Sequence, residues 1–88
     1  MLYLVAFKSS NEAAKAYAAA YVASIAETFW TEFDGIWFLK TRKNAVEIRD
    51  RLRCLSGPTD GVAVALLAGF TAWHGFDADA QKWLLENL

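Results

Sequence analysis

Five basic residues near the middle of this 88-residue chain are its clearest candidates for binding chemistry. They are Lys40, Arg42, Lys43, Arg49 and Arg53. Clustered cations bind phosphate groups, so this cluster is a candidate nucleic-acid site. Acidic residues are interleaved with it, and Glu47 stands four positions before Arg51, a spacing that favours an ion-paired helix surface. The net charge of −1 also lacks the basic excess that is typical of nucleic-acid binders.

Four aromatic residues offer a second route to nucleic acid. Tyr3, Phe7, Trp37 and Phe38 could stack bases if they shared the open face of a sheet, as the aromatic residues of RRM domains do. The RRM consensus is absent, however, so the sequence favours packing in a core or a dimer interface for these side chains.

No pattern in the sequence predicts a catalytic residue, a bound metal or a cofactor. His74, Asp77 and Asp79 could hold a metal ion, but a surface histidine, a helix cap and a first-turn acid explain them without one. The five glycines are scattered, so there is no phosphate-binding loop. No Ser-His-Asp or Cys-His order suggests a nucleophile.

Three features point to a cytoplasmic protein. The single Cys54 excludes an internal disulfide and fits a reducing compartment. Residues 1–8 lack the positive leader and the cleavage site of a signal peptide. The apolar run from Val62 to Gly69 is too short to cross a bilayer.

The elements that position these residues follow from turn signals and apolar runs. Asp34-Gly35, between two apolar runs, predicts a hairpin with a type I′ turn, which needs positive φ at both residues. The arms of the hairpin are residues 28–33 and 36–39. The second arm is apolar throughout and belongs in the middle of a sheet. Residues 2–7 and 62–67 are further strands, and residues 69–76 are irregular or form a short extra strand.

An alanine-rich helix follows the first strand. Ser9 and Glu12 have the spacing of a capping box, and we expect the helix to run from there to about Glu27. The face toward the sheet should carry Tyr17, Tyr21 and Ile25, with Ala14 and Ala18 beside them. The opposite face carries a stripe of small residues, Ala16, Ala19, Ala23 and Ala26. Small residues let another helix approach closely, so this alanine stripe is a candidate interaction surface, although helix propensity alone also explains it.

Two further helices are expected. The second begins near Lys43 or Asn44 and ends with Gly57 as its C′ residue, before Pro58. Its apolar stripe is Ala45, Ile48, Leu52 and Leu55. Asp77 caps the last helix, one side of which is formed by Ala80, Trp83, Leu84 and Leu88.

The predicted order is strand, helix, strand, strand, helix, strand, with a helical extension at the C-terminus. Two βαβ-like halves around a hairpin give an α+β, ferredoxin-like βαββαβ domain that spans residues 1–88. In that fold the first two helices cover one face of the sheet and leave the other open. Because three strands are apolar on both faces, the open face needs a cover, either the C-terminal extension or a second copy of the chain.

A family resemblance rests on the middle and the end of the chain. It is carried by Trp37-Phe38-Leu39-Lys40-Thr41, Ala45, Ile48-Arg49-Asp50-Arg51-Leu52 and Trp83-Leu84 before the terminal Leu88. This pattern resembles the small SinR-like proteins, which are similar in turn to the ferredoxin-like adaptation subunit of CRISPR systems and to the VapD-type ribonucleases. The resemblance implies a ferredoxin-like homodimer, in some members a metal-dependent nuclease or a nucleic-acid scaffold. Catalytic relatives carry an aspartate just after the first strand, where Phe7 and Lys8 stand here, and lysine cannot ligate a hard divalent cation.

Three functions of different classes remain open. We favour a non-catalytic, dimeric protein-interaction module, which the resemblance links to phage defence or mobile elements. The alternatives are a nucleic-acid-binding scaffold and, less favoured, a metal-dependent endonuclease. The isoelectric point of about 5.7 counts against the scaffold and Lys8 against the endonuclease. The chain is 56% hydrophobic, whereas a domain this small buries only about 60–65% of its unfolded surface, which favours a second subunit or a protein partner.

Overall fold

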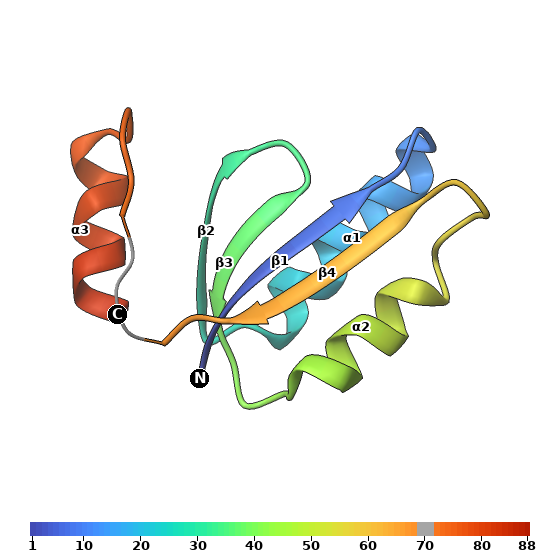
Figure 1. Ribbon diagram of the computed structural model, residues 1–88, viewed down its shortest axis with the longest axis horizontal. Coiled ribbons are helices and arrows are strands. Elements are labelled where there is room, and N and C mark those ends of the chain that lie inside the picture. Colours follow the sequence, from blue (N-terminus) through green and yellow to red (C-terminus); the bar gives the residue numbers. More distant parts are fainter. Residues whose placement is uncertain (69–71) are drawn as a thin grey trace.

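Four strands form one antiparallel sheet in the order β2-β3-β1-β4 in the computed structural model, which describes residues 1–68 and 72–88 (Figure 1). The strands are β1 (Leu2–Lys8), β2 (Thr28–Phe33), β3 (Ile36–Lys40) and β4 (Gly61–Leu66). The helices are α1 (Glu12–Ile25), α2 (Ala45–Arg53) and α3 (Ala78–Asn87). The α+β class is confirmed, as is the central position of β3 between β2 and β1. No strand forms over residues 72–77, and the rest of that predicted segment, 69–71, lies outside the described residues.

The β2–β3 hairpin turns at Asp34-Gly35, but the predicted type I′ conformation is wrong. Gly35 has a φ of 73°, whereas Asp34 keeps a negative φ. The register of β2 shifts between Trp30 and Phe33, and such a bulge supplies the strand twist that a type I′ turn would otherwise provide. A Cβ on Gly35 would lie 2.5 Å from the carbonyl oxygen of Phe7, so the close approach of the turn to β1 requires glycine.

The core lies between the sheet and the layer formed by α1 and α2. Alternate strand residues point into it, and the register places Tyr3 opposite Leu39 and Val5 opposite Trp37. The predicted stripe of α2 is confirmed, with Ile48 and Leu52 fully buried and Ala45 and Leu55 packed at the margin. The remaining core residues are Phe7, Ala14, Ala18 and Val22.

α1 faces the sheet with smaller residues than we expected. Its buried residues are Ala14, Ala18 and Val22, whereas Tyr17 is 65% exposed. The two alanines let the helix lie close to the sheet, and Tyr17 precedes Ala18 by one position, which turns its side chain about 100° away. Tyr21 only flanks the core, so residue size was the wrong guide to the buried face.

Asparagine residues cap the first two helices. Asn11, not Ser9, is the N-cap of α1, since its Oδ1 accepts hydrogen bonds from the first-turn N–H groups at 2.9 and 3.2 Å. The Ser9 hydroxyl oxygen instead accepts a hydrogen bond from the Asn11 N–H at 3.0 Å. Asn44 and Glu47 form the capping box of α2.

Gly57 does not end α2 in the predicted way, because it has no positive φ and the helix stops at Arg53. The last turn tightens instead. The N–H of Leu55 donates to the carbonyl of Leu52, and that of Ser56 to the carbonyl of Arg53, both at 3.0 Å. These hydrogen bonds, each between residues three positions apart, satisfy carbonyl groups at the end of the helix, so a glycine in the left-handed conformation is not needed there.

α3 lies beside β2 (Figure 1). It packs on the face of the sheet opposite to α1 and α2, because Leu84 lines a hollow together with Leu4 and Phe38, which point to that face. Asp77 caps it as predicted, with Oδ1 accepting from the N–H of Ala80 at 2.8 Å. The indole N–H of Trp83 donates to the Thr28 hydroxyl at 2.8 Å, and Leu84 is fully buried. Leu88 follows the helix as its C-cap and is 51% exposed, so it does not share the buried side.

The segment before α3 completes the cover. The ring of Phe76 packs on Phe33 and Phe38, with centroid distances of 5.7 and 6.3 Å. Phe38 and Leu2, which point to this face, are only 8% and 7% exposed. Of the two expected covers, the C-terminal extension therefore protects the β2–β3 half of this face.

Candidate interaction surface at the sheet edge

β4 is an edge strand that lacks every common protection against pairing with another strand. Its sequence, Gly61-Val62-Ala63-Val64-Ala65-Leu66, has no charge and no proline, and its register with β1 is unbroken. Within the described residues no further strand pairs with its outer side, and α2 lies alongside it (Figure 1). Soluble proteins usually blunt such edges with charges, proline, bulges or a covering segment. β4 therefore presents a strand that is ready to pair.

The backbone groups of Val62, Val64 and Leu66 point away from the sheet. The N–H of Leu67 donates to the carbonyl of Leu2 at 2.9 Å, which makes these two residues a hydrogen-bonded pair. Such pairs occur at every second position of an antiparallel ladder. The β4 residues two, four and six positions before Leu67 therefore bond to β1, and the three residues between them turn their N–H and C=O groups outward.

The exposed apolar surface continues from β4 onto α2. Leu66 is 53% exposed and Val46 is 54% exposed. A hollow of about 140 Å³ between the two elements is lined by Ala45, Val46, Arg49, Val62 and Val64. We call Val46 together with residues 62–66 the β4 edge surface. Sequence reasoning identified the strand but not this surface.

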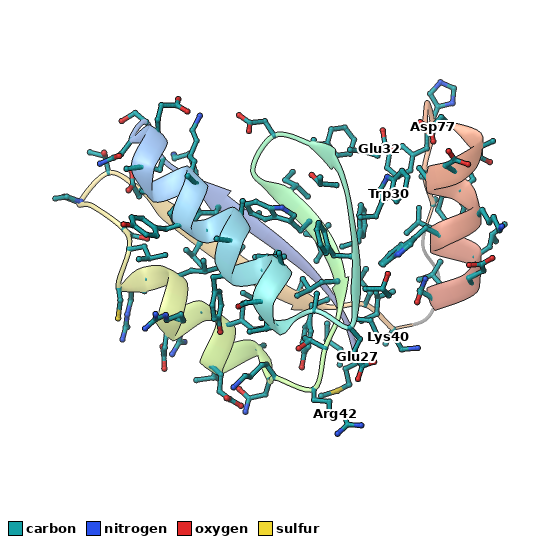
Figure 2. All side chains as sticks on the ribbon, turned by 180° about the vertical axis from the view of Figure 1, so that it is seen from behind. Glu27, Trp30, Glu32, Lys40, Arg42 and Asp77 are labelled. Carbon is teal, nitrogen blue, oxygen red and sulfur yellow. The ribbon has the colours of Figure 1, made fainter. Side chains whose placement is uncertain are left out.

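The other edge, β2, is protected in several ways. The bulge between Trp30 and Phe33 interrupts its ladder, and α3 packs beside it. Glu32 adds a charge, and its Oε1 accepts a hydrogen bond from the Trp30 indole at 2.8 Å. Figure 2 shows both side chains between the ribbons of β2 and α3. The two edges of one sheet thus differ, and only β4 is open.

The predicted basic cluster is divided into two groups, each with its own carboxylates. Lys40 and Arg42 lie with Glu27 at the end of the sheet where β3 ends (Figure 2). The Arg42 Nε lies 3.5 Å from Glu27 Oε1, and the Lys43 Nζ lies 3.8 Å from Glu47 Oε2. Within residues 1–68 and 72–88, no carboxylate lies within 4.0 Å of the Lys40 ammonium.

Arg49 and Arg53 share one carboxylate on α2. The Arg49 guanidinium donates two hydrogen bonds to Asp50 Oδ1, at 3.1 and 2.8 Å, and the Arg53 guanidinium lies 3.7 Å from the same atom. The bonds from Arg49 lower the pKa of Asp50 below its ordinary value, and the charge of Arg53 adds a smaller effect in the same direction. One carboxylate therefore offsets the charge of one of the two cations, and the three side chains together carry a net charge of +1.

The predicted pairing of Glu47 with Arg51 is wrong. Glu47 pairs with Lys43 on the side of the capping box, which holds its carboxylate over the first turn. The Arg51 guanidinium lies over the ring of Tyr21, 6.0 Å from its centroid. Burial raises the pKa of Tyr21, and the charge of Glu47 adds to this.

The core packing that the sequence favoured for the four aromatic residues is confirmed, and a shared base-stacking platform is excluded. Tyr3, Phe7 and Trp37 are buried beneath α1 and α2, whereas Phe38 lies on the opposite face against Phe76. Successive residues of a strand point to opposite faces, so Trp37 and Phe38 cannot share a platform. These side chains serve the two cores of the domain.

The alanine stripe is exposed along most of its length. Ala16, Ala19 and Ala23 are solvent-exposed, as expected for a surface stripe. Ala26 is the C-cap of α1 and packs at the margin of the core, so the stripe holds three members and not four.

A hollow of about 530 Å³ lies at the other end of the sheet, between the end of β1, the hairpin turn and the start of β4. Lys8, Lys15 and Asp34 are its charged lining residues. The Lys15 ammonium lies 3.2 Å from Glu12 and 3.7 Å from Asp34, and the hydrogen bond and charge of Glu12 raise the pKa of Lys15. The described residues contain no group of three His, Cys, Asp or Glu side chains placed to hold a metal, His74, Asp77 and Asp79 included.

No family model, characterised protein or solved structure matches this chain. None of the helices in the described part of the chain has the length and apolar content needed to cross a bilayer. The candidate interaction surface therefore rests on the geometry of the chain itself.

Proposed function

We propose that this chain is a cytoplasmic, non-catalytic, homodimeric protein-interaction module with a ferredoxin-like fold, related to the SinR-like small proteins. The element order and the position of β1 between β3 and β4 support the fold. The observation that carries the function is the β4 edge surface, which is uncharged, unbulged and uncovered.

An open apolar edge has a physical cost that a partner removes. Within the part of the chain that the structure describes, no hydrogen bond reaches the outward N–H and C=O groups of β4, and the exposed side chains of Val46 and Leu66 flank the strand. A second strand would replace water along the whole edge and cover those side chains. Natural sheets retain such an edge where it is used for pairing, because otherwise it promotes aggregation.

The distribution of charge supports a protein partner over nucleic acid. Arg42, Lys43, Arg49 and Arg53 each have a carboxylate within 4.0 Å. A phosphate backbone would have to compete with these carboxylates, which weakens the counterion release that drives nucleic-acid binding. No observation favours the scaffold or the endonuclease as a second function.

Light scattering coupled to size exclusion tests the proposal. At micromolar concentration the wild type should give twice the chain mass of 9.8 kDa. The variant A63K/A65K, which adds two charges at exposed positions of the edge, should shift to monomer. The matched variant A19R/A23E places two charges on the alanine stripe and should remain dimeric. A wild type that stays monomeric over all concentrations would refute the proposal, and loss of the dimer only in A19R/A23E would move the interface to α1.

A further inference from the structure

We infer that two copies of this chain join through antiparallel pairing of β4 with β4, with Val64 of each copy opposite the other on the two-fold axis. This inference rests on the proposed homodimer and names its interface. The result is one continuous sheet in which α1 and α2 of both copies lie on one face and both α3 helices lie on the other.

The direction of the backbone groups limits the pairing. Only Val62, Val64 and Leu66 turn N–H and C=O outward, so these residues must form the hydrogen-bonded pairs of a new ladder. An isologous contact also requires that a residue and its partner exchange places across the axis. The centres that pair at least two of these three residues with outward residues of the copy are Ala63, Val64 and Ala65.

The three centres differ in the number of backbone groups they satisfy. Centring on Val64 pairs Val64 with its own copy and Val62 with Leu66 in both directions, so every outward group of the strand is bonded. Centring on Ala63 leaves Leu66 opposite Asp60, which lies before the strand. Centring on Ala65 leaves Val62 opposite Ala68, which lies after it. The Val64 centre is thus the one that uses the whole edge.

The side chains agree with the same centre. On the helix face, valine meets valine and Val62 meets Leu66, so the 53%-exposed Leu66 is covered by an apolar partner. On the other face, Ala63 meets Ala65, and both are small enough to leave room beside α3. No charge enters the ladder, and Arg49, which lines the neighbouring hollow, brings its own carboxylate in Asp50.

Directed disulfide formation tests the register. Ala63 and Ala65 are opposite each other in a non-hydrogen-bonded pair, where Cα atoms lie about 4.5 Å apart, within the range that a disulfide spans. Each alanine is about 8 Å from its own copy, which is too far. The variants are A63C and A65C, each in a C54S background that removes the exposed native cysteine. Both positions are exposed, so the fold should tolerate them.

The expected result is that neither variant cross-links alone under mild oxidation, whereas an equimolar mixture cross-links up to about half of its chains, the share of mixed dimers. Cross-linking of A63C alone would indicate the Ala63 centre, and cross-linking of A65C alone the Ala65 centre. Either result overturns the inferred register. A wild-type dimer in which no combination cross-links would overturn the inference and leave the proposed function standing. A monomeric wild type would overturn both the inferred register and the proposed homodimer. The partner of β4 would then be a strand of another protein.

Discussion

Replacing Leu84 by alanine should destabilise the domain far more than the same change at its neighbour Leu85. Leu84 is fully buried in α3 against the sheet, whereas Leu85 is 68% exposed. The two substitutions have the same effect on helix propensity and lie in the same helix. The difference between them therefore isolates the docking of α3 onto the sheet.

The magnitude follows from burial. Truncating a fully buried leucine costs about 2–5 kcal/mol, whereas an exposed position changes stability by about 0.5 kcal/mol or less. We expect the lower end, about 2 kcal/mol, for L84A, because the loss cannot exceed the free energy with which α3 docks. In a chain of 88 residues this corresponds to a fall in Tm of roughly 8–16 °C, against a total stability of roughly 4–13 kcal/mol.

Urea and thermal unfolding, followed by circular dichroism and tryptophan fluorescence, measure the difference. Dye binding supplies a second readout. Phe38 lines one hollow with Leu84, so an undocked α3 should uncover it and raise the fluorescence of a hydrophobic dye in L84A but not in L85A. Equal stabilities and equal dye binding for the two variants would show that α3 does not cover the sheet. The β2–β3 half of the face opposite to α1 and α2 would then be open, and it would compete with the β4 edge surface as an interaction site.

Three further outcomes are expected. In light scattering, A63E/A65K should dimerise more tightly than A63K/A65K by roughly 1–4 kcal/mol. The inferred register sets Glu opposite Lys in the first variant and Lys opposite Lys in the second, so equal dimer affinities would contradict that register. In an NMR titration, R49A should raise the pKa of Asp50 toward its ordinary value, because Arg49 donates two hydrogen bonds to the Asp50 carboxylate. This ion pair stabilises the fold at pH values above the pKa that Asp50 has in the unfolded chain, and the stabilisation is lost as the pH falls through the lowered pKa of the folded state. R49A should therefore weaken the fall in stability over that acidic range. Repurified protein should show no divalent-metal-dependent cleavage of RNA or DNA, because Lys8 stands where the catalytic members of the family that the chain resembles carry aspartate; cleavage that one acidic substitution abolishes would overturn this.

Local chemistry explains which parts of the fold were predictable. The strands and the hairpin follow from apolar runs on either side of Asp34-Gly35, and the cap at Asp77 follows from its own side chain. The turn type depended on a bulge several residues away, between Trp30 and Phe33. A rule that considers only the two turn residues, Asp34 and Gly35, does not predict a bulge elsewhere in the strand.

Features that depend on depth or on distant partners were predicted less well. The buried face of α1 was predicted only in part. Ala14 and Ala18 are buried, and Tyr21 and Ile25 pack at the margin of the core, but Tyr17, whose bulk was weighted over its distance from the sheet, is exposed. Lys43, adjacent in space to Glu47, took the carboxylate that was expected to pair with Arg51. The predicted basic cluster is divided into two groups, and one carboxylate partner, that of Arg42, comes from Glu27, before β2.

The edge position of β4 also depends on distant parts of the chain, which explains why the sequence did not indicate the β4 edge surface. Apolar residues on both faces of a strand suggest a covered strand, and β3 fits that interpretation, being buried on both faces. β4 has the same composition at the end of the sheet, where α2 covers one face and the alanines of the other are exposed. The order β2-β3-β1-β4 alone distinguishes the two strands. Because α3 already covers the β2–β3 half of the open face, the strand of this sheet that still lacks a neighbour is β4, and a copy of the same strand would satisfy its outward backbone groups and cover the exposed Leu66.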